Sequence, residues 1–408
     1  MSLRQDCEFI VQEAIRHVLP GEAVKRALTG KSFSSGRLLL VAAGKAAWSM
    51  AHASYEVLGA RIDGGIVITK YGHSGGAIGN LTICEAGHPV PDENSFRATE
   101  RALAMTAHLT AEDTVLFLLS GGGSALFESP AVTPQELQHI TAQLLGCGAD
   151  IVEINTLRKR LSRVKGGRFA RHCAPAGVET IVLSDIVGDP LDMIASGPAC
   201  PDSSICADAM RIAGKYGLAL SEEARRCLQT ETPKFLGNVN TVITGSVREL
   251  CRGAAAACAA RGYEPTLLTD CLTCQAREAG RFLAAVAKTH HGGKKRAFIA
   301  GGETVVYVTG QGKGGRNQEL ALAAAEGIAG LADVAVFSVG SDGTDGPTDA
   351  AGGYVDGSTA AVLAAQNVSI DAVLRNNDAY HALALTDGLL ITGATGTNVN
   401  DVSVVLIG

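Results

Sequence analysis

The feature that most constrains the fold of this chain is a regular alternation of short apolar runs with segments of helical periodicity. In the first half, the runs have the near-continuous apolar character of parallel strands that are buried on both faces, and they cover residues 38–43, 65–69, 82–86, 114–119 and 179–184. Helices are expected around them, at 4–18, 45–58, 92–109, 134–146, 156–172 and 205–216. This order predicts an N-terminal α/β/α Rossmann-like parallel sheet with right-handed crossovers.

A second series of apolar runs begins near residue 240. Strands are expected at 241–244, 266–269, 297–300, 304–309, 334–339, 389–393 and 402–407, and helices at 246–261 and 317–329. The segment Gly301-Gly302-Glu303 separates two of these runs and indicates a hairpin. The second sheet is therefore expected to be mixed.

A chain of 408 residues is too long for one ordinary core, and two domains are expected. We place the boundary in the stretch 230–240, which contains Pro233 and Gly237. This predicts an N-terminal domain over 1–238 and a smaller C-terminal α/β domain over 239–408. Because ligands of open α/β sheets bind beyond the carboxyl ends of the strands, we expect the active site in an interdomain cleft.

The composition of the chain argues against nucleic acids and membranes as binding partners. The net charge is −6, no Lys/Arg run suggests a nucleic-acid footprint, and aromatic residues make up only 4%, which is poor for base stacking. No apolar stretch reaches 18 residues and no apolar signal region is present, so we expect a cytoplasmic protein without a membrane segment. The 11 cysteines are expected to be reduced; the CxxC match at Cys271 and Cys274 is expected to be a pair of ordinary buried thiols, with a redox role as the alternative.

Glycine-rich turns at the ends of expected strands indicate anion binding. Gly44 and Lys45 follow the run at 38–43 and open a helix, where backbone N–H groups and an ammonium group suit phosphate. The segment Ser120–Ser124 follows the run at 114–119, and its three glycines between two serines suit an anion nest. The alternatives are a surface lysine at a helix start and a flexible loop.

Two polar segments also lie in the first half of the chain. Asn155 and Lys159 share one face of an expected basic helix, which Asn155 is expected to cap, and this face suits an anionic substrate. A solvated basic helix is the alternative. The segment Ser184–Pro190 places Asp189 shortly after a strand, where its carboxylate can act as a general base or hold a metal, or form a turn.

In the second half, the segment Gly310–Gly315 matches G-x-G-x-x-G and is followed by Arg316. A dinucleotide site is therefore a serious alternative to a cationic loop for the phosphates of ATP, in which Arg316 stabilises a transferring phosphoryl group. Further along, Asp342 and Asp345 belong to a run of three carboxylates at a strand end. Such a run suits Mg²⁺, and Asx-turns are the alternative.

Taken in order, these motifs resemble the class II glycerate kinases, a family with a C-terminal MOFRL domain. The resemblance covers nearly the whole chain and rests on the segments 43–46, 120–126, 155–159, 165–167, 184–190, 301–304, 314–319 and 341–346. It implies ATP-dependent phosphorylation of D-glycerate with Mg²⁺, usually at the 2-hydroxyl. Some relatives carry the label hydroxypyruvate reductase, so an NAD(P)H-dependent reductase is the alternative, and a non-catalytic sugar-acid sensor is a third hypothesis.

The motifs and the resemblance together lead to a set of expected roles. Lys45 and Arg316 are expected to neutralise charge during transfer, and Asp189 to orient or deprotonate the glycerate hydroxyl. The expected contacts of ATP are Gly44, Ser120, Gly121, Gly122, Gly123, Ser124, Gly312, Lys313, Gly314 and Gly315; those of glycerate are Asn155, Lys159, Lys165 and Glu303; and those of Mg²⁺ are Asp342 and Asp345. Beyond these small molecules, the one partner considered is a second copy in a homodimer.

Overall fold

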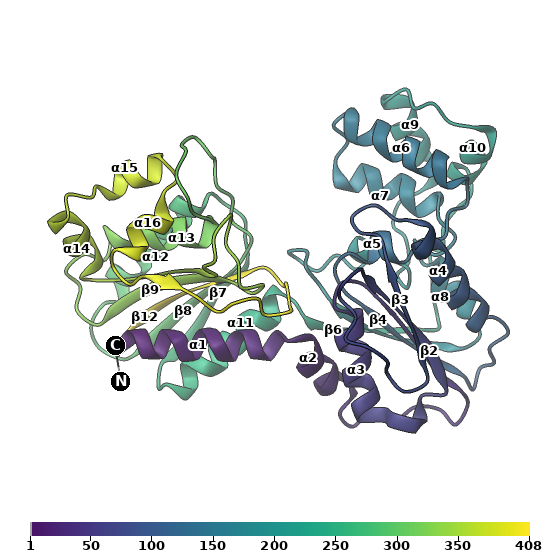
Figure 1. Cartoon of the computed structure of the whole chain (residues 1–408), viewed down its shortest axis with the longest axis horizontal. Helices are drawn as coiled ribbons and strands as arrows, with labels where there is room; N and C mark the ends of the chain where they lie inside the picture. Colours follow the sequence, from purple (N-terminus) through teal and green to yellow (C-terminus); the bar gives the residue numbers. More distant parts are fainter. Residues whose placement is uncertain (1) are drawn as a thin grey trace. The chain divides into compact units, whose positions relative to one another are not determined.

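The computed structural model describes residues 2–408 and divides into two compact units (Figure 1). The N-terminal unit consists of residues 24–184 and 189–244, and the C-terminal unit of residues 2–23, 185–188 and 245–408. This division differs from the expected boundary between 238 and 239. It falls between 244 and 245, and it assigns the first helix and a short segment after residue 184 to the C-terminal unit.

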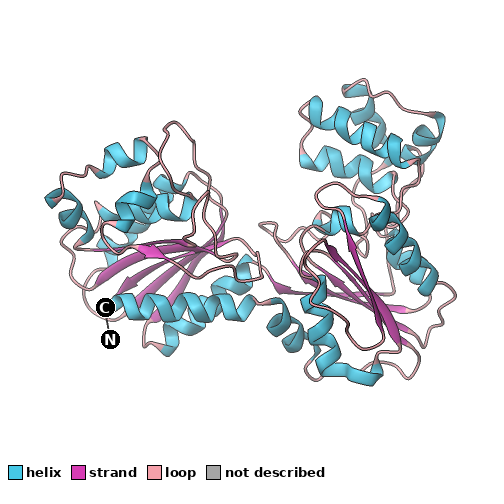
Figure 2. Ribbon diagram, viewed as in Figure 1, coloured by secondary structure: helices cyan, strands magenta, loops and turns pink. Residues whose placement is uncertain are grey.

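A six-stranded sheet forms the centre of the N-terminal unit. Its strands are β1 (Leu38–Ala43), β2 (Gly64–Lys70), β3 (Leu81–Ala86), β4 (Thr114–Leu119), β5 (Gly177–Leu183) and β6 (Val239–Gly245). Their order is β3-β2-β1-β4-β5-β6, the strand order of the Rossmann fold, and the pairs from β3 through β5 are parallel. The expected parallel sheet is confirmed, and Figure 2 shows helices on both of its faces.

The strand expected at 241–244 belongs to this first sheet and does not open the second one. It is β6, which lies next to β5, and the amide of Val178 donates to the carbonyl of Asn238 just before β6 begins (2.7 Å). An apolar run shows that a strand forms, but it does not show which sheet edge accepts that strand. The free backbone groups of the edge decide this.

The N-terminal unit also holds most of the helices. They are α2 (Pro20–Leu28, which continues from the C-terminal unit), α3 (Ala47–Leu58), α4 (Glu93–Met105), α5 (Gly123–Leu126), α6 (Pro134–Gly146), α7 (Ile151–Arg160), α8 (Arg168–Cys173), α9 (Cys206–Lys215) and α10 (Glu222–Leu228), with 3₁₀ turns at Gly59–Arg61 and Ile194–Ser196. Helices α6, α7, α9 and α10 gather at one end of this unit (Figure 1) and share an apolar core that includes Leu137, Leu157 and Ile212.

The single helix expected at 156–172 is two helices, α7 and α8. Gly166 and Gly167 interrupt it with left-handed φ values of 56° and 80°, which glycine adopts without a steric penalty. Helix α7 also begins earlier than expected. Asp150 caps it by accepting the amide of Glu153 (2.8 Å), so the expected cap, Asn155, instead lies inside the helix.

A second six-stranded sheet forms the centre of the C-terminal unit. Its strands are β7 (Glu264–Leu272), β8 (Arg296–Gly302), β9 (Val334–Gly340), β10 (Gly352–Asp356), β11 (Leu389–Leu390) and β12 (Asp401–Ile407), in the order β11-β10-β9-β12-β8-β7. Strands β7 and β8 are parallel, and the remaining pairs are antiparallel. The expected mixed sheet is confirmed.

Three details of this sheet differ from expectation. The run at 304–309 is not a strand, because only Val305 forms a bridge, to Gln275; the hairpin expected at Gly301-Gly302-Glu303 is therefore wrong. The strand expected at 389–393 is reduced to Leu389–Leu390. Strand β10 was not expected, since its residues follow a run of turn-forming aspartates and glycines.

Helices cover both faces of the second sheet (Figure 1). They are α1 (Leu3–Val18), α11 (Val247–Ala260), α12 (Ala276–His290), α13 (Arg316–Ala325), α14 (Thr359–Ala365), α15 (Ile370–Arg375) and α16 (Ala379–Ala384). Ile10 of α1 and Leu250 of α11 share one core cluster with Val404 of β12. Leu283 of α12 and Leu320 of α13 share another with Val405. Neighbouring residues of β12 thus face opposite layers, and α1 belongs to this unit because its apolar face is part of that core.

Two expectations from composition can be compared with the described residues. Across residues 2–408, no helix is long and apolar enough to cross a membrane. All 11 cysteines are free thiols, but Cys271 and Cys274 are exposed, so the expectation that they are buried is wrong. They lie at and just beyond the end of β7, where the strand leaves the sheet edge.

Candidate functional site

In the N-terminal unit, two glycine turns lie against each other at the carboxyl ends of β1 and β4. The amide of Lys45 donates to the carbonyl of Gly121 (2.9 Å), and the amide of Ala46 donates to the hydroxyl of Ser120 (3.0 Å). Gly44 has a φ of 132°, and a Cβ at this position would lie 2.2 Å from the Ser120 oxygen. The close approach therefore requires glycine, and it joins the two expected phosphate-binding turns.

The Gly121–Ser124 loop presents backbone donors at this edge of the sheet. Gly122 adopts a left-handed φ of 84°, and Gly123 begins the short helix α5. Within residues 2–408, the amides of Gly121 and Gly122 have no hydrogen-bond acceptor. Free amides in such a turn form a concave donor surface for an anion.

Lys45 is exposed beside this loop and carries an unpaired charge. Its side chain lies next to Gly122, and no carboxylate or other group in residues 2–408 bonds to its ammonium. The ring of His88 also lies next to Gly122. Burial and the charges of Lys45, Lys70 and His73 lower the pKa of this histidine. A cluster of basic groups without acidic partners gives the loop a positive potential.

Beneath the loop, Lys165 is fully buried. Its ammonium donates to the carbonyls of Ser124 (2.8 Å) and Phe127 (2.9 Å) and pairs with the buried Glu128 (3.3 Å). Burial lowers the pKa of Lys165, and Glu128 opposes this shift. All three donors of the lysine are used inside the protein, so in this structure it supports the loop and has no free donor for glycerate.

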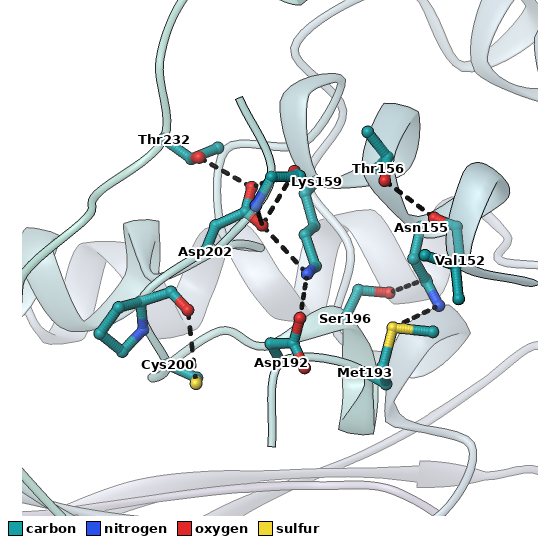
Figure 3. A network of polar contacts seen from close by, with 12 residues as sticks. Val152, Asn155, Thr156, Lys159, Asp192, Met193, Ser196, Cys200, Asp202 and Thr232 are labelled. Atoms are coloured by element: carbon teal, nitrogen blue, oxygen red, sulfur yellow. Dashed lines mark hydrogen bonds and ion pairs between the residues drawn. The ribbon is translucent and has the colours of Figure 1, made fainter. Parts of the chain in front are cut away.

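The ammonium group of Lys159 is also engaged in contacts within the protein. Its ammonium lies between Asp192 (3.0 Å) and Asp202 (3.1 Å), and Asp202 accepts a further hydrogen bond from Thr232 (Figure 3). Only 3% of the lysine is exposed. The pair ties α7 to two segments that follow β5, so Lys159, like Lys165, has a supporting position.

Asn155 connects α7 to the glycine loop. Its side-chain oxygen accepts from the hydroxyl of Ser196 (2.8 Å), and that hydroxyl lies 3.3 Å from the hydroxyl of Ser124 (Figure 3 shows the Asn155–Ser196 contact). Its amide nitrogen contacts the sulfur of Met193 at 3.7 Å. The structure therefore brings the expected Asn155 within two contacts of the loop.

Asp189 has an available carboxylate oxygen. It adopts a left-handed φ of 51°, a region that Asp tolerates better than most residues. Its Oδ1 atom is buried and has no hydrogen-bond partner within residues 2–408. A buried acceptor of this kind is suited to a hydroxyl donor.

In the C-terminal unit, a cavity of about 920 Å³ holds most of the expected residues of that half. Its walls include Glu303, Arg316, Asp342 and Asp345, together with the Asp185–Val187 segment. This volume lies within the range of small-molecule sites, about 300–1,000 Å³. The cavity is lined by residues of the C-terminal unit alone.

Arg316 is the central charge of this cavity. Its guanidinium forms a two-point contact with Asp401 (2.5 and 3.0 Å) and a single one with Glu303 (2.9 Å). Burial raises the pKa of Asp401, and the contact with Arg316 opposes that shift. Three of the five N–H donors of Arg316 are used, and two remain.

Asp345 occupies the N-terminus of α13. Its two carboxylate oxygens accept the amides of Asn317 (3.1 Å) and Gln318 (2.8 Å), the position where a helix otherwise attracts an external anion. Burial raises the pKa of Asp345 to about 6. With both oxygens already in use, this carboxylate is poorly placed to hold a metal.

The first four residues of the Gly310–Gly315 loop do not present their amides to a ligand, whereas the amides of Gly314 and Gly315, at the cavity wall, have no acceptor within residues 2–408. The amide of Gly310 donates to the side chain of Asn377 (2.9 Å), that of Gly312 to the carbonyl of Asn376 (2.8 Å), and that of Lys313 to Asp378 (2.9 Å). Residues 304–309, which precede the loop, do not form a strand. The pattern therefore lacks the strand–turn–helix context of a dinucleotide fingerprint.

Three residues of these two sites were missed from sequence. Asn400 is 4% exposed and donates to Glu303 (3.2 Å), and it precedes Asp401, the partner of Arg316. His88 contacts the glycine loop from the segment after β3. A signal for Asn400 exists in the polar run Asn398–Asp401, but nothing in the spacing connects it to Arg316, since 83 residues lie between them.

Two family models match the chain. Residues 6–229 match the model described as "Domain of unknown function (DUF4147)", and residues 296–401 match the model described as "MOFRL family". The first match covers strands β1 to β5 and the glycine loops of the N-terminal unit. The second covers the cavity residues from Glu303 to Asp401.

The chain is also similar to characterised and solved proteins over its full length. It is 52% identical to the "D-glycerate 2-kinase" of Thermotoga maritima, covering 100% of this chain and 99% of that one. It is 37% identical to a "Putative hydroxypyruvate reductase" of Agrobacterium vitis, covering 100% and 95%. A crystal structure of glycerate kinase from Thermotoga maritima matches with a TM-score of 0.94 at 52% identity, covering 100% and 99%.

Proposed function

Because the chain belongs to the glycerate 2-kinase family with a C-terminal MOFRL domain, we propose that it transfers the terminal phosphoryl group of ATP to D-glycerate and yields 2-phosphoglycerate and ADP. The observation that carries this proposal is the 52% identity with a D-glycerate 2-kinase over the whole length of both chains. The reductase label occurs at lower identity, and the loop that a dinucleotide would need follows no strand and has the amides of Gly310 to Lys313 occupied.

The loop Gly121–Ser124 and Lys45 are proposed to bind phosphate oxygens. Two free amides and an unpaired ammonium at the carboxyl end of a parallel sheet form a preorganised anion site. Catalysis of phosphoryl transfer depends on such fixed charges, because negative charge is spread over the transferring group. Lys45 is mobile and unpaired, so it can follow that group without breaking a contact.

Arg316 is proposed to supply a second positive charge. Its two remaining donors are available while Asp401 and Glu303 hold the guanidinium plane. Removing an electrostatic stabiliser of this kind costs about 10²–10³ in kcat in other enzymes. The amides of Gly312 and Lys313 are occupied inside the protein, so their expected roles in ATP binding receive no support from the hydrogen bonds of that loop. The amides of Gly314 and Gly315 have no acceptor within residues 2–408 and remain candidates for phosphate contacts.

A magnesium ion fits Asp342 better than Asp345. Asp342 lies in the cavity wall, and one of its oxygens accepts only the amide of Thr344 (3.0 Å), which leaves the other for a cation. In residues 2–408, no group of three or more His, Cys, Asp or Glu side chains is arranged to hold a metal. This agrees with the usual coordination of Mg²⁺ in kinases, in which one or two carboxylates bind the ion and phosphate and water oxygens complete its coordination shell. Bound there, the ion would neutralise phosphate charge.

Asp189 is proposed to orient the acceptor hydroxyl of glycerate. Its unpartnered Oδ1 can accept the hydroxyl proton as the oxygen forms a bond to phosphorus. Glu303 is held by Arg316 and Asn400, and through the carboxylate face that remains it is the candidate acceptor for a second hydroxyl.

One assay separates the proposed function from its alternative. Purified protein is incubated with D-glycerate, ATP and Mg²⁺, and ADP release is followed beside NADH oxidation with hydroxypyruvate. We expect ADP release that depends on D-glycerate, no NADH oxidation, and a ³¹P spectrum of the product that matches 2-phosphoglycerate. NADH oxidation without ATP would contradict the kinase assignment, and a 3-phosphoglycerate spectrum would contradict the assigned hydroxyl.

A further inference from the structure

The basic segment of α7 contains three cations in a row, and only one of them has no partner. Lys159 is paired with Asp192 and Asp202. Arg160 is fully buried and bonds to Ser204 (2.8 Å) and to the carbonyl of Thr156. Arg158 forms no hydrogen bond or ion pair within residues 2–408.

An unpaired guanidinium in a half-buried position is unusual. Burial lowers the pKa of Arg158, and the charge of Glu128 opposes that shift. Arginine presents five donors in a planar fork, and desolvating these donors without an acceptor is costly. Within residues 2–408 no acceptor lies within hydrogen-bond distance of these donors, although one oxygen of Glu128 has no partner, and a ligand that supplies acceptors explains the position best.

Two observations relate Arg158 to the end of the glycine loop. It acts electrostatically on Lys165, whose ammonium donates to the carbonyl of Ser124 (2.8 Å). It also lies one turn along α7 from Asn155, which reaches Ser124 through Ser196. The charge of Arg158 and its position on α7 therefore both relate it to Ser124, at the end of the loop proposed to bind phosphate.

The charge balance of this cluster calls for an anion. Arg158 and Lys165 carry two positive charges, and Glu128 carries one negative charge that is already paired with Lys165 (3.3 Å). One positive charge is left in a partly desolvated position. A planar carboxylate matches the fork of arginine through two parallel hydrogen bonds, which a lysine cannot form.

We propose that Arg158 binds the carboxylate of D-glycerate and thereby selects a hydroxy acid over a neutral polyol. The assignment rests on the proposed kinase function, and it replaces the expectation that Lys159 and Lys165 make this contact. Lys159 and Lys165 instead hold α7 and the loop in place. Glu128 keeps the guanidinium near the loop and leaves its donors to the substrate.

The test compares three variants of the full-length enzyme under steady-state conditions. Arg158→Gln removes the charge and keeps a long side chain, and Arg158→Lys keeps the charge without the fork. Arg163→Gln is the matched control, because Arg163 is exposed in the same segment and pairs only with Glu100 (2.7 Å). KM and kcat are measured for D-glycerate and for ATP separately, and kcat/KM is measured for glycerol, which lacks the carboxylate.

We expect KM for D-glycerate to rise about 100-fold in Arg158→Gln, because a hydrogen bond to a charged group contributes about 10- to 150-fold in affinity. Arg158→Lys should show an intermediate rise, and Arg163→Gln none. KM for ATP should stay within about twofold. The preference for D-glycerate over glycerol should shrink by the same factor as KM rises, a change that a general loss of folded protein cannot produce.

Each other outcome overturns the assignment. An unchanged KM for D-glycerate shows that Arg158 does not bind the substrate, and a larger rise in KM for ATP shows that it binds phosphate instead. If Arg158→Gln does not fold, KM for D-glycerate and KM for ATP are compared in the Arg158→Lys variant instead. Wild-type protein that cannot phosphorylate D-glycerate contradicts the proposed function as well, whereas active wild type with an unaffected Arg158→Gln contradicts this inference alone.

Discussion

The two cations expected to be catalytic, Lys45 and Arg316, lie in opposite electrostatic settings. Lys45 is exposed beside a glycine loop and has no partner within residues 2–408. Arg316 is clamped by Asp401 and Glu303 in a cavity that is rich in carboxylates. The N-terminal unit thus offers unpaired positive charge and free amides, and the C-terminal unit offers a neutralised charge and carboxylate oxygens.

This difference predicts that substitutions of the two residues have different consequences. An unpaired lysine can bind an incoming anion without breaking an existing contact, but no contact fixes the direction of its side chain. A clamped arginine is oriented, and the same clamp makes it part of the folded structure. We therefore expect substitutions of Lys45 to change activity alone, and substitutions of Arg316 to change activity and stability together.

The largest expected effect is the loss of activity in Lys45→Met. Removing the ammonium should lower kcat by about 10³-fold, because a charge aimed at the transferring group is lost. The melting temperature should stay within about 1 °C of the wild type, since no ion pair is broken. Lys294→Met, at another exposed lysine, is the control. A large drop in melting temperature would show that Lys45 has a structural partner.

Arg316→Met should lower kcat by about 10²–10³-fold and also destabilise the protein. Asp401 would remain buried without its cation, and breaking a buried pair in this way costs about 3–5 kcal/mol. The double variant Arg316→Met/Asp401→Asn should recover much of the free energy of unfolding but none of the activity. Denaturant unfolding measures the first quantity, and ADP release the second. Equal losses of unfolding free energy in the single and double variants would contradict the structural role that distinguishes Arg316 from Lys45.

Lys159→Met should destabilise the N-terminal unit without a matching loss of catalysis. It leaves Asp202, whose side chain is fully buried, without its closest cation. We expect a loss of about 3 kcal/mol in the free energy of unfolding, softened because Arg160 lies 3.5 Å from the same carboxylate. The kcat of the folded fraction should change less than tenfold. A rise in KM for D-glycerate that exceeds the rise in Arg158→Gln would restore Lys159 as the substrate ligand.

The smallest expected effect is a pH dependence that involves Asp345. Its folded-state pKa is raised from 3.8 to about 6, so the folded protein holds this proton more tightly than the unfolded chain does. The resulting stability is fully present below about pH 3.8 and is lost as the pH rises through about 6. Relative to Asp345→Asn, the wild type should therefore lose about 3 kcal/mol of unfolding free energy between pH 4 and pH 7. A pH-independent difference between the two proteins would contradict this.

The comparison also shows how far sequence reasoning reaches in each unit. In the N-terminal unit, the strands at 38–43 and 114–119 and the glycine turns that follow them were predicted correctly, because the signal is local: an apolar run, then glycine, then lysine or serine. The anion-binding role of these turns stays a prediction. In the C-terminal unit, the strong local match at Gly310–Gly315 was misleading. The amides of its first four residues are taken by Asn376–Asp378, which lie about 65 residues later in the chain.

The same limit applies to the basic helix α7. Its charges were visible in the sequence, which favoured the face of Asn155 and Lys159 for the substrate. The structure shows that Lys159 is buried against Asp192 and Asp202, whereas Arg158 forms no hydrogen bond or ion pair within residues 2–408.

By itself, the sequence determined the two α/β sheets, the family, and the position of the glycine turn with Lys45. These features depend on the periodicity of apolar residues and on short motifs, which are properties of neighbouring residues. Only the tertiary structure decided which charges are neutralised, which amides are free and which sheet takes β6. These depend on groups that are far apart in the chain, and for a buried charge the presence or absence of one such partner changes its energy by several kcal/mol.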